Sequence, residues 1–88
     1  MEMKIAVRQC ADQMGNQRCF HYFLTIEQEE TPRLFCENYG VRIVEEQGDT
    51  ASVPGITTSA KRIDELITLL VDNQVGPAGL ADVVADWL

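Results

Sequence analysis

Apolar and other residues alternate through the first half of the chain, the pattern of β-strands that bury one face. In the run 4–10, Ile5 and Val7 share one side, while Lys4 and Arg8 share the other. The run 18–27 is the most β-prone stretch of the chain. One side of this strand carries Phe20, Tyr22, Leu24 and Ile26. The opposite side carries Cys19, His21, Phe23 and Thr25. Gly15-Asn16 lies between the runs and favours a tight turn, so an antiparallel hairpin is predicted.

Two more strands are expected before residue 54. Residues 27–33 predict an acidic turn broken at Thr31-Pro32. A strand then runs from 34 or 35 to 46, and a short one covers 50–53 and ends at Pro54-Gly55. Short connections between four successive strands predict a meander.

The apolar spacing becomes helical after residue 60. One helix carries Ile63, Leu66, Ile67 and Leu70; a second carries Leu80, Val83, Val84 and Trp87, the last expected as a core anchor. Thr57, Thr58 and Ser59 are candidate N-caps of the first helix. The prediction is an α+β fold: a four-stranded antiparallel meander (β-β-β-β) followed by two C-terminal helices packed on one sheet face.

The chain has 88 residues, enough for a single domain spanning 1–88. No apolar run approaches the roughly 20 residues of a membrane span, and the start lacks the order of a secretory signal, so a cytoplasmic protein is expected. In a domain this small, hydrophobic gain and ordering entropy nearly cancel, so pairing with another chain would stabilise it.

The charge balance is acidic, with 7 Lys and Arg against 14 Asp and Glu and a net charge of -7. Binding nucleic acid requires clustered basic residues that neutralise phosphates, so nucleic acid is not an expected partner.

The three cysteines and the single histidine offer little recognisable chemistry. There is no C-x-x-C pair, so the sequence supplies no ligand set for structural zinc. Reduced thiols are expected at Cys10, Cys19 and Cys36, the alternative being a Cys10–Cys19 disulfide across the hairpin. Cys19 and His21 would lie about 7 Å apart along a strand, too far for direct proton transfer without bending. Cys10 is the alternative partner of His21 if the strand register brings the two together.

Other catalytic patterns are also missing from the sequence. Asp82 and Asp86 fall opposite the apolar side of the last helix, where a solvated face is expected. The six glycines form no phosphate-binding loop. We therefore expect no enzyme and no cofactor.

One group of side chains remains as a candidate interaction surface on the sheet face away from the helices. It comprises Arg8, His21, Phe23, Arg42 and Val44, with Lys4 beside them. A mildly basic, partly apolar patch on an acidic protein could meet a protein partner or a second copy. Two alternatives stay open: a small-molecule or anion sensor using Arg8, His21 and Arg42, and strand residues that simply face water.

The chain resembles a family of small uncharacterised bacterial proteins, domain-of-unknown-function family 6514. The resemblance rests on Tyr39-Gly40-Val41, Ile56-Thr57-Thr58, the stretch 63–70, and Val75-Gly76-Pro77 followed by the last helix. It covers mainly the C-terminal half and implies one intact domain, but it implies no activity. The sequence therefore predicts a small acidic interaction or regulatory module, able to form a homodimer.

Overall fold

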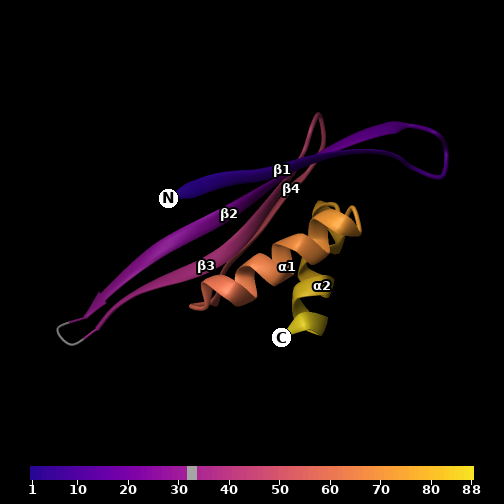
Figure 1. Cartoon of the computed structure of the whole chain (residues 1–88). Coiled ribbons are helices and arrows are strands. Elements are labelled where there is room, and N and C mark those ends of the chain that lie inside the picture. Colours follow the sequence, from indigo (N-terminus) through magenta and orange to yellow (C-terminus); the bar gives the residue numbers. More distant parts are fainter. Residues whose placement is uncertain (32–33) are drawn as a thin grey trace.

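Four antiparallel strands form one open sheet, and two α-helices lie against one of its faces (Figure 1). This computed structural model describes residues 1–31 and 34–88. The elements are β1 (Glu2–Ala11), β2 (Gln17–Thr31), β3 (Leu34–Glu45), β4 (Thr50–Thr57), α1 (Ala60–Asp72), the 3-10 turn η1 (Pro77–Gly79) and α2 (Leu80–Trp87). The strands are ordered β1-β2-β3-β4, so the predicted meander and its two following helices are confirmed.

Three strands extend beyond their predicted ends: β1 by two residues at its start and one at its end, and β2 and β4 by more. β2 continues to Thr31, which pairs with Leu34, so the first part of the expected acidic turn is strand; Pro32 and Arg33 lie outside the described residues. β4 passes through Pro54-Gly55, where Gly55 has a φ of 64° and the pairing with β3 shifts register between Tyr39 and Val41. Proline is tolerated there because β4 is an edge strand with one side unpaired.

A bulge in β1 overturns part of the predicted face assignment. The pairing with β2 shifts register between Lys4 and Ala6. Beyond the bulge, Val7 lies opposite His21 and Arg8 lies opposite Phe20, which is buried in the core. One extra residue in a strand moves every later side chain to the other face. Arg8 therefore belongs to the helix-covered face and Val7 to the opposite one, the reverse of the prediction.

The core lies between the sheet and the helices. Its buried side chains are Phe20, Tyr22, Val41 and Ile43 from the sheet, Ile63, Leu66, Ile67 and Leu70 from α1, and Leu80 and Val84 from α2. Ser59 caps α1, since its side chain accepts the N–H of Arg62. Trp87 is half-buried against the core, with the Arg62 guanidinium 4.4 Å from its ring centre.

Tyr22 fastens the sheet to the connection between the helices. Its ring is fully buried, and its hydroxyl donates a 2.9 Å hydrogen bond to the carbonyl of Val75. Burial raises the pKa of Tyr22 to about 12, because the phenolate would lose its hydration.

This burial predicts a loss of stability in alkali. The pKa of Tyr22 rises on folding, so its contribution is complete below about pH 10 and is lost as the pH rises toward about 12. Urea unfolding followed by circular dichroism from pH 9 to 12 measures this dependence. Tyr22→Phe should lose about 1–2 kcal/mol at neutral pH and show a shallower alkaline decline. An equally steep decline in the variant would contradict the assignment.

Candidate functional site

The helices leave one broad sheet face uncovered within the described part of the chain (Figure 1). We call this the reverse face. Cross-strand pairing aligns Phe23 with Arg42 and His21 with Val44, so these four predicted residues are brought together. Lys4 joins them opposite Phe23, and Val7 joins them opposite His21. Arg8 does not belong to this group.

The guanidinium of Arg42, on the reverse face, is neutralised by a carboxylate of the same chain. Arg42 lies over the Phe23 ring, 4.6 Å from its centre. Its guanidinium also makes a two-pronged ion pair with Glu2, with Nε 2.8 Å from Oε2. Bidentate pairing of this kind fixes both side chains and leaves Arg42 little capacity to bind an added anion.

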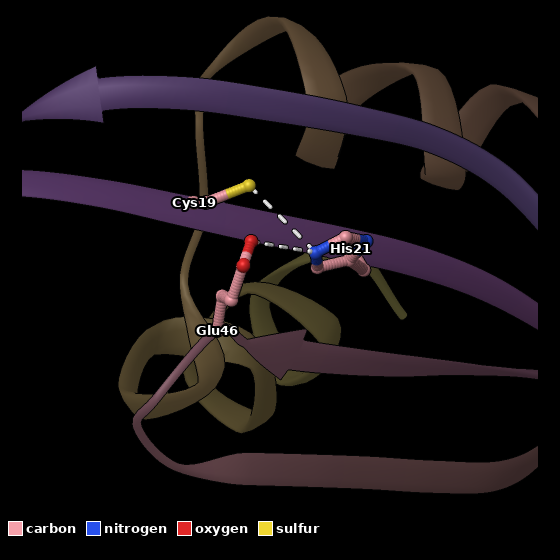
Figure 2. Close-up of side chains that lie close together, drawn as sticks. All are labelled: Cys19, His21 and Glu46. Atoms are coloured by element: carbon pink, nitrogen blue, oxygen red, sulfur yellow. Dashed lines mark hydrogen bonds and ion pairs between the residues drawn. The ribbon is translucent and has the colours of Figure 1, made fainter.

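A compact cluster of polar side chains lies at one end of this face: Cys19, His21 and Glu46 (Figure 2). Cys19 and His21 are two residues apart on β2, so both side chains project from the same side. Glu46 follows β3, and its N–H donates a 2.9 Å hydrogen bond to the carbonyl of Cys19. This backbone contact places the Glu46 carboxylate beside the other two side chains.

The three donor atoms lie close together. His21 Nε2 is 3.7 Å from Cys19 Sγ and 3.4 Å from Glu46 Oε2, and the three ligand atoms lie within 4.8 Å of one another. Both contacts use the same imidazole nitrogen. A catalytic triad instead needs the acid on one ring nitrogen and the nucleophile on the other. The cluster therefore has the arrangement of a ligand set rather than of a proton relay.

The pKa shifts within the cluster argue against a nucleophilic thiol. Burial, followed by the hydrogen bond to Glu46, raises the pKa of the Cys19 thiol. The hydrogen bonds from Cys19 and His21 lower the pKa of Glu46. A thiol activated for nucleophilic attack has a lowered pKa, so Cys19 lacks that activation.

A hollow opens directly beside the cluster. Its volume is about 310 Å³, and it is lined by Gln9, Gln17, Arg18, Cys19, Glu46 and Gln47. The Glu46 side chain is 61% exposed, whereas that of His21 is 23% exposed. The donor atoms are therefore partly sheltered by the sheet and remain open to a ligand from solvent.

Sequence reasoning did not place Cys19 and Glu46 in a site. The spacing of about 7 Å was expected only without bending, and in the structure the two side chains do lean toward each other, with Cys19 Sγ 3.7 Å from His21 Nε2. A Cys-x-His pair on one strand, with a glutamate at the end of the next, was the available signal. It could be used only once the strand register was known.

The structure also excludes the Cys10–Cys19 disulfide alternative. Cys10 pairs with Arg18 and packs toward the core, whereas Cys19 pairs with Gln9 and faces the other way. Among the described residues the three cysteines are free, so the expected thiols at Cys10, Cys19 and Cys36 agree with the structure.

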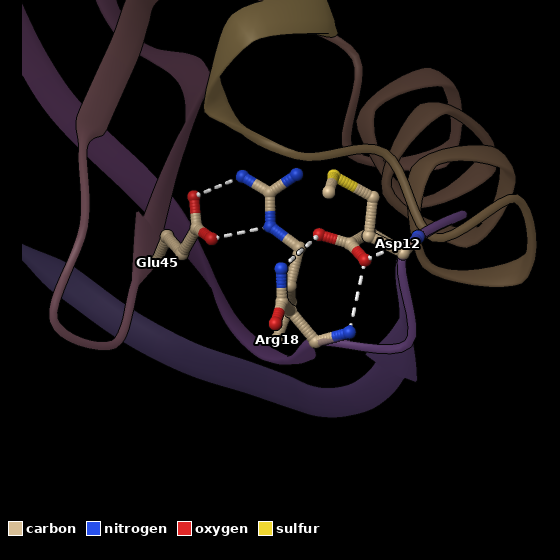
Figure 3. Close-up of polar contacts among 5 residues, drawn as sticks. Asp12, Arg18 and Glu45 are labelled. Carbon is tan, nitrogen blue, oxygen red and sulfur yellow. Dashed lines mark hydrogen bonds and ion pairs between the residues drawn. The ribbon is translucent and has the colours of Figure 1, made fainter.

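A second polar cluster lies on the helix-covered side, at the other surface of the same sheet end (Figure 3). Arg18 makes a two-pronged ion pair with Glu45, at 2.6 and 2.8 Å. The Asp12 carboxylate accepts the N–H groups of Met14 and Asn16, each at 2.9 Å, and closes the β1–β2 turn. These charges are satisfied within the chain, so this cluster stabilises turns rather than offering free ligands.

The comparisons with known proteins identify a family without a known role. The model of a family described as "Family of unknown function (DUF6514)" matches residues 1–88. The sequence motifs had indicated a resemblance mainly over the C-terminal half. The family match instead covers the whole chain. No curated protein and no solved structure matches. In the described part of the chain, no helix is long and apolar enough to cross a membrane.

Proposed function

The chain belongs to the DUF6514 family of unknown function, and we propose that it is a non-catalytic interaction module of the cytoplasm that pairs with a second copy of itself. The contact surface is the reverse face. The observation that carries this proposal is an exposed apolar surface whose neighbouring charges nearly balance: Arg42 is ion-paired with Glu2, and the positive charge of Lys4 acts on the Glu46 carboxylate.

Apolar side chains on the reverse face are open to solvent. Val7, opposite His21, is 44% exposed. Phe23 and Val44 are half-buried beside it. Burying these side chains against another apolar surface would gain roughly 25 cal/mol for each Å² removed from water.

The charge distribution favours a second copy as the occupant. The outer sides of the helices carry exposed acidic residues: Asp64, Glu65, Asp72, Asp82 and Asp86. On the reverse face, the Glu2 carboxylate is ion-paired with Arg42, and the positive charge of Lys4 lies near enough to Glu46 to help lower the pKa of that carboxylate. Two copies of a protein with a net charge of -7 repel least where their facing surfaces are close to neutral.

Sedimentation equilibrium tests the proposed dimer. The wild type should sediment as a dimer at about 100 μM, and Val7→Glu should sediment as a monomer because it buries an unpaired carboxylate at the contact. Leu69→Glu is the matched control. The exposed fraction of Leu69 is 41%, similar to the 44% of Val7, but Leu69 lies on α1. It should leave the dimer intact.

Two results would overturn this proposal. One is a wild type that is monomeric at every concentration, which would leave only a different protein as partner. The other is dissociation by Leu69→Glu and not by Val7→Glu, which would move the contact to the helices.

The alternative of an anion sensor receives less support. It requires Arg8, His21 and Arg42 to act together, yet Arg8 lies on the helix-covered face opposite Phe20. Arg42 is bound by Glu2. Without two free cations on one surface, the reverse face offers an anion little electrostatic gain.

A further inference from the structure

We propose that Cys19, His21 and Glu46 form a binding site for a divalent zinc ion, held by one sulfur, one nitrogen and one oxygen. This inference does not depend on the proposed dimer, because all three ligands come from one chain. It goes beyond the family assignment and the interaction surface.

The spacing of the donor atoms fits a tetrahedral ion. With Zn–S near 2.3 Å and Zn–N and Zn–O near 2.0–2.1 Å, tetrahedral angles separate sulfur from nitrogen by about 3.6 Å and nitrogen from oxygen by about 3.4 Å. The observed separations are 3.7 Å for Cys19 Sγ to His21 Nε2 and 3.4 Å for His21 Nε2 to Glu46 Oε2. Two edges of the ligand tetrahedron are therefore already present.

Hydrogen bonds to the Glu46 carboxylate engage both Cys19 and His21, so the approach of Cys19 Sγ to His21 Nε2 is a further contact at a nitrogen that is already engaged. An imidazole nitrogen carries either one hydrogen or one lone pair, so Nε2 directs a single interaction along its axis. Here a sulfur and a carboxylate oxygen both face it (Figure 2). An ion bound between the three donor atoms would contact all of them.

The donor chemistry suits zinc. Imidazole, thiolate and carboxylate are all established zinc ligands. On binding, the Cys19 thiol gives up its proton to solvent, and the resulting thiolate and the Glu46 carboxylate together balance the two positive charges of the ion. Three protein ligands leave the fourth coordination position of the ion for a water molecule. The hollow beside Cys19 and Glu46 has room for that water.

The fold holds the three ligands on a rigid base. Cys19 and His21 lie on β2, a central strand, and Glu46 is fixed by its backbone hydrogen bond to Cys19. Bound zinc would tie β2 to the β3–β4 turn. It would thereby restrain the exposed carboxylate, which is the ligand that still has freedom to move.

Cobalt titration tests the site directly, because cobalt(II) takes the same ligands and reports them spectroscopically. Full-length protein, freed of metal and kept reduced, is titrated with cobalt chloride. We expect one equivalent to give a thiolate-to-cobalt absorption in the near ultraviolet and intense visible bands typical of tetrahedral geometry. One equivalent of zinc chloride should abolish them, with a zinc Kd tighter than about 10 μM.

Matched variants identify the ligands. Cys19→Ser should remove the thiolate absorption, and His21→Ala and Glu46→Gln should each weaken zinc binding at least about tenfold. Cys10→Ser and Glu45→Gln are the controls, since these neighbouring residues project toward the core side of the sheet. Both should retain the cobalt spectrum, and circular dichroism establishes that every variant is folded.

Several results would overturn the proposal. These are the absence of a thiolate band with cobalt, its persistence in Cys19→Ser, its loss in Cys10→Ser, or zinc binding weaker than the stated limit. A monomeric protein that binds zinc would leave this site standing while excluding the dimer, so the two proposals fail separately.

Discussion

Replacing Leu66 with alanine should destabilise the protein by about 3–4 kcal/mol. Leu66 lies in the middle of α1, and no part of its side chain is exposed. The substitution removes three buried carbon atoms and leaves a cavity that the sheet on one side and the helix on the other cannot fill. Small domains have only about 5–15 kcal/mol of stability, so a loss of this size is a large fraction of the total.

Urea unfolding monitored by circular dichroism measures this loss. Leu69→Ala is the matched control, because it makes the same chemical change on the same helix at a position that is 41% exposed. It should change the free energy of unfolding by less than about 0.5 kcal/mol. Equal losses in the two variants would mean that α1 does not pack on the sheet through the Leu66 side.

Gly40→Ala should cost about 2–3 kcal/mol, because β3 and β4 approach too closely there to admit a side chain. An added Cβ would lie 2.5 Å from the carbonyl oxygen of Val53, 2.6 Å from Thr25 Oγ1 and 2.7 Å from the Cα of Pro54. Two of these three atoms are backbone, so the strands themselves would have to separate. The register shift in β3–β4 pairing occurs at this residue, and the bulge would be strained first.

Gly79→Ala is the control for this second prediction. A Cβ at Gly79 would make only an ordinary contact, 3.5 Å from Val75 Cγ1, and the residue has a φ of -96° that alanine adopts freely. Its free energy of unfolding should stay within about 0.5 kcal/mol of the wild type or rise slightly. If both alanine variants were equally stable, close approach of the strands would not be the reason for glycine at 40.

The same spatial explanation applies to a second glycine among the motifs that carried the family resemblance. At Gly76, an added Cβ would lie 2.9 Å from the Phe20 ring, so the Val75-Gly76-Pro77 corner packs directly onto a core side chain. The motif residues could be recognised in the sequence. The reason for them, which is contact with β2 and β4, is visible only in the folded chain.

Periodicity in the sequence was sufficient for the architecture. The helical spacing of Ile63, Leu66, Ile67 and Leu70 gave the buried side of α1, and all four are buried. The alternation in β2 gave its core face, including Phe20 and Tyr22. These assignments succeed because a helix and a strand each bury one face, and that requirement is written into the order of residues.

The register in which the strands pair could not be predicted from the sequence. The bulge between Lys4 and Ala6 places Val7 and Arg8 on the faces opposite to those predicted. The residue types in β1 give no signal of this bulge. Arg42 carried a charge in the sequence but is bound to Glu2, which is 40 residues away. Register errors of one residue reverse a face, so a surface assembled from several strands depends on contacts that local patterns do not contain.

The order of residues by itself determined four strands, two helices and the buried sides of β2, α1 and α2, because those follow from local periodicity and burial. Only the tertiary structure decided which polar side chains meet. Glu46 reaches Cys19 and His21 because β2 and β3 pair in one particular register, with the Glu46 N–H bound to the Cys19 carbonyl. Convergence of donors from separate segments is a property of that pairing, since it depends on distances through space rather than along the chain.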